Sequence, residues 1–236
     1  GPEGETPAPD AAPPFREGPW VPQLQVPPRS QMEEQEKYKH DVCSPSSLAS
    51  VLEFWGINRA TADLAERVRD RTTQVFGDWP FNVAVAASLG LEGFVARLES
   101  LEDLQMEVAQ GRPVVVSVTF GPGELGGAPI QKTQGHIMVV AGFTPQGDVI
   151  AMDPAAPERA ATRRIYDRAQ FHRAWRVNKR GLAYILGPAL KRKLTVGVPV
   201  ADLQAAPRRK KKLALNDSDH KSQLLYGESV TVLEAK

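Results

Sequence analysis

The sequence predicts an α+β fold in which helices come first and the strands of an antiparallel sheet come later. Apolar residues recur at helical spacing between positions 45 and 89, whereas apolar runs of strand length become frequent between 93 and 186. A parallel α/β sheet would instead alternate strands with helices along the chain. The 236 residues, 42% hydrophobic and 24% charged, allow one full domain plus a tail or small module.

The first predicted helix has a clear apolar face and clear ends. Pro45 suits the first turn, where a missing N–H costs nothing, and Gly56 is a natural stop. The apolar face is formed by residues at the i, i+3, i+4 and i+7 positions, namely Leu48, Val51, Leu52 and Trp55.

Caps and β-branched runs define the later elements. Ser100 with Asp103 resembles a capping box, and Asp167 is the expected N-cap of the last helix. The run 113–118 is apolar on both faces, as a central buried strand should be. The predicted helices span 45–55, 60–70, 80–89, 101–110 and 167–176, and the predicted strands span 93–98, 113–120, 135–143, 147–152 and 181–186.

The chain divides into three segments. Residues 1–22 are rich in Pro, Gly, Ala and Glu without apolar periodicity, which predicts a disordered leader. Residues 23–188 have the pattern of a compact domain, and residues 189–236 are richer in Lys and Arg. The basic run 208–212 is interpreted as a solvated loop. The more specific alternative is that it binds an anionic cell-wall polymer. The chain opens on Gly-Pro rather than Met, so we expect processing that would hide any signal peptide.

Charge and composition exclude several function classes. A net charge of +1 gives no general electrostatic basis for binding nucleic acid or an anionic membrane. No run of 18 or more apolar residues predicts a membrane span. The single cysteine excludes a disulfide scaffold, and no Cys/His cluster has metal-ligand spacing. We therefore expect neither a metal nor an organic cofactor.

Cys43 is the candidate nucleophile because it immediately precedes the first predicted helix. The unpaired N–H groups and the positive end of the helix dipole favour the thiolate form of a cysteine placed there. The simpler alternative is that Cys43 is a small buried apolar residue without chemistry.

His136 and Asp153 are brought together by a predicted hairpin. His136 opens an apolar strand, the segment 144–147 reads as a turn, and Asp153 with Pro154 ends the second strand. If the loop consists of the two residues 145 and 146, position i pairs with position 291 − i. Asp153 then lies diagonally across from His136 on the same face, with Cα atoms roughly 7–8 Å apart. A register slip of one residue would place Asp153 on the opposite face.

Together these residues match the nucleophile, base and orienting acid of a thiol hydrolase. Individually each has a structural explanation, since a His that opens a strand is commonly structural and Asp-Pro commonly starts a turn. The ordered combination of Cys43, His136 and Asp153 favours the catalytic interpretation.

Four ordered motifs resemble a known family. They are Cys-Ser-Pro-Ser-Ser at 43–47, Gly-Asp-Trp-Pro-Phe-Asn at 77–82, Gly-His at 135–136, and Met-Asp-Pro-Ala-Ala at 152–156. The chain resembles bacterial papain-like cysteine peptidases of the peptidase C-thirty-nine-like family, related to the domains that remove double-glycine leaders from bacteriocins. The resemblance runs from Pro27 to Leu186, with Asp78 replacing the family's Asn. It implies a papain-like cysteine peptidase fold.

The resemblance also implies an oxyanion-binding glutamine upstream of the cysteine. Ser30-Gln31 resembles the family's Ser-Gln segment, which assigns this role to Gln31. The charged insertion 33–42 separates Gln31 from Cys43, so Gln35 is the alternative. Residues 198–207 and 222–233 in the tail resemble the first strands of a bacterial Src-homology-3-like domain, a partial small β-barrel. Its open edges predict either a homodimer that exchanges strands or a tail that packs back on the first domain.

These features predict a secreted or envelope-associated bacterial thiol hydrolase that acts on a peptide or other amide bond through an acyl-enzyme. One alternative is an acyltransferase or amidase with the same triad and another acyl acceptor. A second alternative is a non-catalytic cell-wall binding module with a vestigial triad. The sequence does not specify the substrate, because specificity depends on cleft loops such as 121–134.

Overall fold

The computed structural model describes residues 23–188 and four short strands in the last part of the chain. By its internal contacts the chain divides into two compact units, Gly1–Pro188 and Ala189–Lys236. The predicted leader, 1–22, lies outside the described residues.

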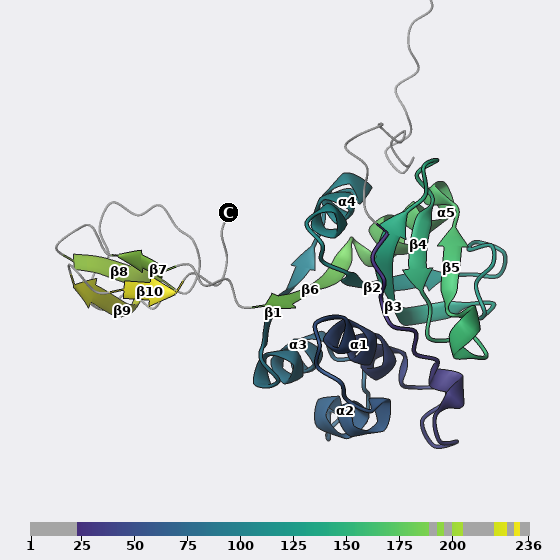
Figure 1. The fold of residues 1–236 in the computed structure, drawn as a ribbon, viewed down its shortest axis with the longest axis horizontal. Coiled ribbons are helices and arrows are strands. Elements are labelled where there is room, and N and C mark those ends of the chain that lie inside the picture. Colours follow the sequence, from purple (N-terminus) through teal and green to yellow (C-terminus); the bar gives the residue numbers. More distant parts are fainter. Residues whose placement is uncertain (1–22, 189–192, 196–199, 205–219, 226–228, 232–236) are drawn as a thin grey trace, which may run out of the picture. The chain divides into compact units, whose positions relative to one another are not determined.

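A six-stranded antiparallel sheet forms the centre of the first unit (Figure 1). The spatial order of its strands is β1-β6-β2-β3-β4-β5, so β6, the last of the six in the sequence, lies between β1 and β2. The mixed helical and antiparallel architecture confirms the predicted α+β class. The strands are β1 (Leu91–Arg97), β2 (Val114–Phe120), β3 (Thr133–Phe143), β4 (Val149–Met152), β5 (Arg163–Tyr166) and β6 (Leu182–Pro188).

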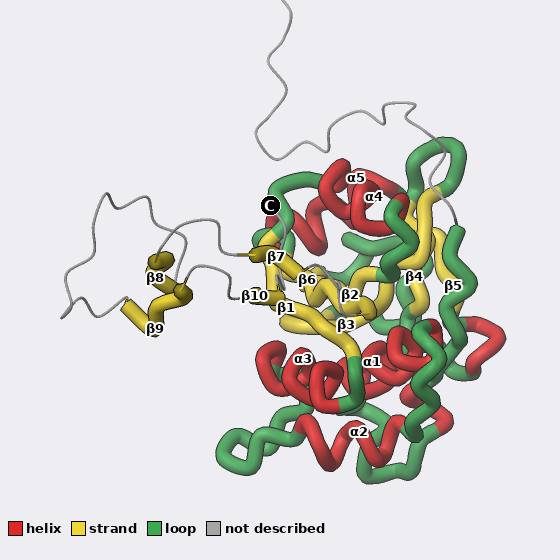
Figure 2. Tube along the Cα trace, turned by 60° about the vertical axis from the view of Figure 1, so that its left-hand side comes forward, coloured by secondary structure: helices red, strands yellow, loops and turns green. Residues whose placement is uncertain are grey.

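Helices cover both faces of this sheet (Figure 2). One face packs against α1 (Cys43–Phe54) and α3 (Trp79–Ser88), and α2 (Thr61–Val68) packs on these two helices on the side away from the sheet. The other packs against α4 (Leu101–Ala109) and α5 (Arg168–His172), which continues as a π-helical turn, η3 (Arg173–Val177). Two short 3-10 turns complete the unit, η1 (Gln31–Glu33) and η2 (Arg159–Ala161).

The β-branched run on β2 explains why the sheet is buried on both faces. Val115 contributes to the core beneath α1–α3, whereas Val114 and Val116 belong to the core beneath α4 and α5. All three are fully buried. Burying a valine completely stabilises a fold by roughly 1.5–3 kcal/mol relative to exposure. This central strand therefore joins the two cores on either side of the sheet.

The predicted caps are present. Ser100 and Asp103 form a reciprocal capping box, in which Asp103 N donates to Ser100 Oγ at 3.1 Å and Ser100 N donates to Asp103 Oδ2 at 3.0 Å. Asp167 accepts a hydrogen bond from Gln170 N at 2.9 Å, as an N-cap should.

Strand β5 was not predicted, because its sequence Arg-Arg-Ile-Tyr lacks a strong apolar pattern.

In the second unit, the structure describes two separate strand pairs. Strand β7 (Lys193–Thr195) pairs antiparallel with β10 (Ser229–Thr231), and β8 (Val200–Gln204) pairs antiparallel with β9 (His220–Leu225). The basic run and most of the remaining segment that would form the predicted Src-homology-3-like barrel lie outside the described residues. Across the described part of the chain, no helix has both the length and the apolar character needed to cross a bilayer.

Candidate active site

Cys43 is the first residue of α1 and lies at the wall of a cleft. The first intrahelical hydrogen bond runs from Ser46 N to Val42 O at 3.0 Å, so the N–H groups of Cys43 and Ser44 precede the helical ladder. The thiol is partly exposed, unlike the fully buried apolar residues that follow it on α1. Cys43 is therefore accessible to a ligand in the cleft.

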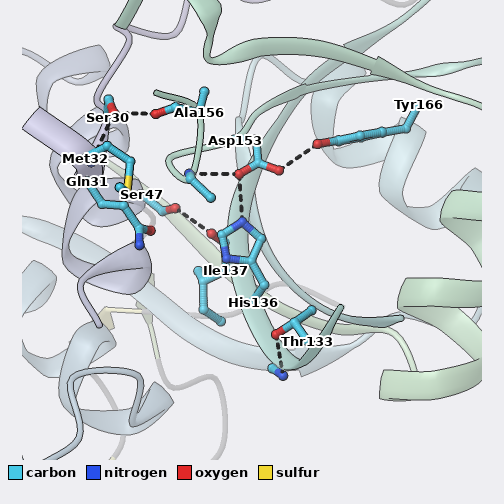
Figure 3. A network of polar contacts seen from close by, with 12 residues as sticks. Ser30, Gln31, Met32, Ser47, Thr133, His136, Ile137, Asp153, Ala156 and Tyr166 are labelled. Atoms are coloured by element: carbon cyan, nitrogen blue, oxygen red, sulfur yellow. Dashed lines mark hydrogen bonds and ion pairs between the residues drawn. The ribbon is translucent and has the colours of Figure 1, made fainter. Parts of the chain in front are cut away.

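His136 lies next to Cys43 and is held from its other side by Asp153. Its Nε2 lies 2.7 Å from Asp153 Oδ1 (Figure 3). The Cys43 side chain lies close enough to the same imidazole to raise its pKa. His136 is 4% exposed and Asp153 is completely buried, so water barely competes for this pair. The structure thus brings together the three residues predicted to form the triad.

The hairpin that joins His136 to Asp153 has a longer loop than predicted. Phe143 pairs with Val149, and the loop 144–148 contains a turn in which Gly147 N donates to Thr144 O at 2.9 Å. The two-residue loop was therefore wrong. Near this loop the strands pair one position away from the predicted register. A bulge between Val140 and Gly142 then restores the predicted register, in which Val140 pairs with Ala151.

The Asp153 carboxylate accepts hydrogen bonds on both oxygens. Ala155 N donates to Oδ1 at 2.9 Å, and Tyr166 OH donates to Oδ2 at 2.6 Å. Tyr166 lies on β5 and is fully buried. Sequence reasoning did not identify Tyr166, because neither β5 nor its register with β4 was predicted. A signal that could have found it is a tyrosine shortly after the Asp-Pro segment, at the end of a short strand.

The charges of this pair reinforce each other. Burial lowers the pKa of His136, but the negative charge and the hydrogen bond of Asp153, together with the nearby Cys43 side chain, outweigh that effect and raise the pKa to about 10. Burial raises the pKa of Asp153, but the charge of His136 and hydrogen bonds from His136, Tyr166 and Ala155 hold the pKa below its usual value. The arrangement favours an imidazolium paired with a carboxylate.

Gln31 is buried at the start of η1 and is anchored to the segment that follows Asp153. Its N–H donates to Pro154 O at 2.8 Å, and the neighbouring Ser30 Oγ donates to Ala156 O at 2.5 Å. Its side-chain Nε2 donates to Lys39 O at 2.6 Å. Gln35, the alternative, is exposed. Gln31 is therefore buried and held by three hydrogen bonds of its segment, although it is not among the residues that line the cleft beside Cys43.

The cleft beside Cys43 has a volume of about 530 Å³. One wall comes from the loop 74–79, which includes the Gly-Asp-Trp part of the second motif. Asn82 fixes this loop, because its Nδ2 donates to Phe76 O at 2.9 Å and to Asp78 O at 2.7 Å. Ser117, Gly135, Ile137 and Lys179 line the side nearer the sheet. The described residues contain no cluster of His, Cys, Asp or Glu that could hold a metal.

A model of the Peptidase_C39 like family matches residues 23–182. The chain belongs to this family. The match covers the helices, strands β1 to β5 and the residues Gln31, Cys43, His136 and Asp153, whereas β6 beyond Leu182 and the C-terminal segment lie outside it. Membership of this family supports a cysteine peptidase. No curated protein matches the chain.

Several solved structures of peptidases are similar to this chain. A protein described as a C39-like peptidase from Bacillus anthracis has a TM-score of 0.51 and 19% identity, covering 69% of this chain and 94% of that chain. The likeness supports the papain-like fold. A double glycine motif protease from an AMS/PCAT transporter, in complex with the leader peptide, matches with a TM-score of 0.49 and 20% identity, covering 70% of this chain and 94% of that chain. The peptidase domain of Streptococcus ComA matches with a TM-score of 0.45 and 23% identity, covering 62% of this chain and 91% of that chain.

Proposed function

We propose that this C39-like peptidase hydrolyses a peptide or other amide bond through Cys43, His136 and Asp153, with an acyl-enzyme intermediate. The observation that carries the proposal is the buried imidazole of His136, held between the Asp153 carboxylate at 2.7 Å and the only thiol in the sequence. A structural cysteine would have no need of a charged imidazole beside it. The geometry therefore supports a working nucleophile.

In the first half of the proposed reaction, the Cys43 thiolate attacks the carbonyl carbon of the scissile amide. The C–N bond then breaks, and the His136 imidazolium gives its proton to the departing amine. Asp153 keeps the imidazole oriented and stabilises its positive charge. The products of this half are a free amine and an acyl thioester on Cys43.

The oxyanion formed during attack needs hydrogen-bond donors. The backbone N–H of Cys43 lies at the start of α1, where it belongs to no intrahelical hydrogen bond. Gln31 supplies the second donor in our proposal. Its amide has two N–H groups, of which one donates to Lys39 O, so the other remains for an oxyanion.

In the second half, neutral His136 takes a proton from water as that water attacks the thioester carbonyl. The C–S bond breaks, a carboxylic acid leaves and the thiolate is restored.

The cleft joins apolar walls, such as Phe76 and Trp79, with the charged groups of Asp41, Asp78 and Lys179. A cavity of about 530 Å³ has room for a short peptide segment.

A peptide-cleavage assay tests the proposal. The full chain is incubated with a peptide library and new termini are sequenced by mass spectrometry, with Cys43→Ala as the matched inactive control. We expect cleaved peptides with the wild type and none with Cys43→Ala. Equal cleavage by both proteins, or none by either, would contradict the proposed function.

A further inference from the structure

Tyr166 meets the active-site carboxylate from the side that His136 leaves open (Figure 3). His136 and Ala155 both occupy Asp153 Oδ1, at 2.7 and 2.9 Å, whereas the Tyr166 OH donates to Oδ2 at 2.6 Å. Within the described part of the chain, no other donor contacts Oδ2. Without Tyr166 this oxygen would be a buried charged acceptor without a hydrogen bond.

Tyr166 itself has little freedom to move. Its backbone pairs with Val149 across β4 and β5, and Asp153 N donates to Thr162 O at 2.7 Å, which extends the same register. The ring stacks on Phe171 with centroids 6.4 Å apart and an interplanar angle of 18°. The hydroxyl is thus aimed at Asp153 by the sheet and by the core beneath α5.

We propose that Tyr166 is a positioning residue of this peptidase, which holds Asp153 ionised and oriented and thereby keeps the His136 imidazolium in place against Cys43. This inference rests on the proposed function. It adds a fourth member to the chain of contacts, in the order Cys43, His136, Asp153, Tyr166. Tyr166 is fully buried and does not line the cleft beside Cys43, so its effect passes through Asp153.

The charges around Asp153 are consistent with this role. His136 on β3 and Tyr166 on β5 face the carboxylate directly, Arg164 acts electrostatically on Tyr166, and Cys43 acts on His136. Burial and the charge of Asp153 raise the pKa of Tyr166 above its ordinary value. The phenol therefore stays protonated and remains a donor wherever Asp153 is ionised.

The test measures the rate at which iodoacetamide alkylates Cys43 as a function of pH. Because Cys43 is the only cysteine, the signal reports this site alone and needs no known substrate. We call the low-pH part of this curve, where the alkylation rate rises with pH, the acid limb. In Tyr166→Phe we expect the acid limb to move up by about one pH unit, with about tenfold slower alkylation at a given pH on that limb. Loss of the donor favours protonation of Asp153, which removes the partner of the imidazolium.

Two variants separate this role from a merely structural one. Tyr38→Phe removes another buried phenol that donates to a carboxylate, that of Glu66, and should leave the limb unchanged. In an Asp153→Asn background, adding Tyr166→Phe should cause no further shift, because no carboxylate remains to titrate. A further shift of the acid limb on adding Tyr166→Phe to Asp153→Asn would overturn the proposal. An unshifted acid limb in Tyr166→Phe alone would also overturn it.

A third variant keeps the packing intact if Tyr166→Phe does not fold. Tyr166→3-fluorotyrosine retains the ring and makes the hydroxyl a stronger donor, so the acid limb should move down instead of up. An unchanged limb would overturn the proposal. Failure of the proposed function gives a different result, since the wild type would then alkylate like a free cysteine and His136→Ala would change nothing.

Discussion

His136 Nε2 lies 2.7 Å from Asp153 Oδ1 because a bulge corrects the register of the hairpin that carries both residues. Near the turn, pairs such as Phe143 with Val149 are offset by one position from the pairs further along. The bulge between Val140 and Gly142 absorbs that offset. Without it, Asp153 would move to the other face of the sheet and lose His136.

Asp153→Asn should lower the pKa of His136 from about 10 toward or below the ordinary value of 6.5, because burial then acts without the opposing charge. Titration of the labelled imidazole by NMR measures this change. Turnover should fall by a factor on the order of 10²–10⁴. Asp167→Asn, which keeps its helix cap, is the control and should leave the His136 titration unchanged.

The same pair makes stability depend on pH. The raised pKa of His136 gives a stabilisation that is fully present below 6.5 and is lost as pH rises through about 10. The lowered pKa of Asp153 gives a second stabilisation, which is present above pH 3.8 and is lost as pH falls through the pKa of Asp153 in the folded protein. Urea unfolding of wild type and Asp153→Asn should therefore differ most between these limits. A constant difference at all pH values would contradict this linkage.

Asn82→Ala should loosen the wall of the cleft. Its amide holds the carbonyl oxygens of Phe76 and Asp78, and leaving buried acceptors unpaired costs about 1–3 kcal/mol. We expect KM to rise more than kcat falls, because the loop shapes the cleft without touching the thiol. Ser88→Ala, on the same helix, removes one exposed hydrogen bond to Val85 O and should change the free energy of unfolding by less than about 0.5 kcal/mol.

Gly181→Ala should destabilise the fold more than Gly111→Ala. Both glycines have positive φ, of 67° and 80°, so alanine is strained at either position. At Gly181 an added Cβ would also lie 1.9 Å from Leu98 O, whereas at Gly111 it would meet open space. The extra cost should be about 1–3 kcal/mol, measured by chemical denaturation. Equal effects would show that the backbone at Leu98 gives way freely.

Truncation after Pro188 should leave labelling of Cys43 unchanged. The two cores of the first unit and the residues Gln31, Cys43, His136 and Asp153 all precede this position. An activity probe detected by mass spectrometry gives the measurement, with light scattering to follow any change of oligomeric state. If the shortened protein resists labelling but the full chain does not, the C-terminal segment contributes to the site.

The sequence was informative where local rules act and less so where distant strands meet. The first helix, the capping box at Ser100 and the β-branched strand follow from spacing and caps, which are local. The hairpin register was right at His136 for an incomplete reason, because the longer loop and the bulge cancel. Tyr166 was missed because its contact with Asp153 depends on the pairing of β4 with β5, which no periodicity in four residues reveals.

The most direct test of the proposed site is the reaction of Cys43 with a peptidyl electrophile at pH 6 in wild type and His136→Ala. At this pH His136 is a cation beside the Cys43 side chain, and a cation in that position promotes attack by the sulfur. We predict that His136→Ala reacts at least about tenfold more slowly, with both proteins equally folded by circular dichroism. Equal rates in the two proteins would show that Cys43 and His136 do not act together, and would contradict the proposed peptidase site.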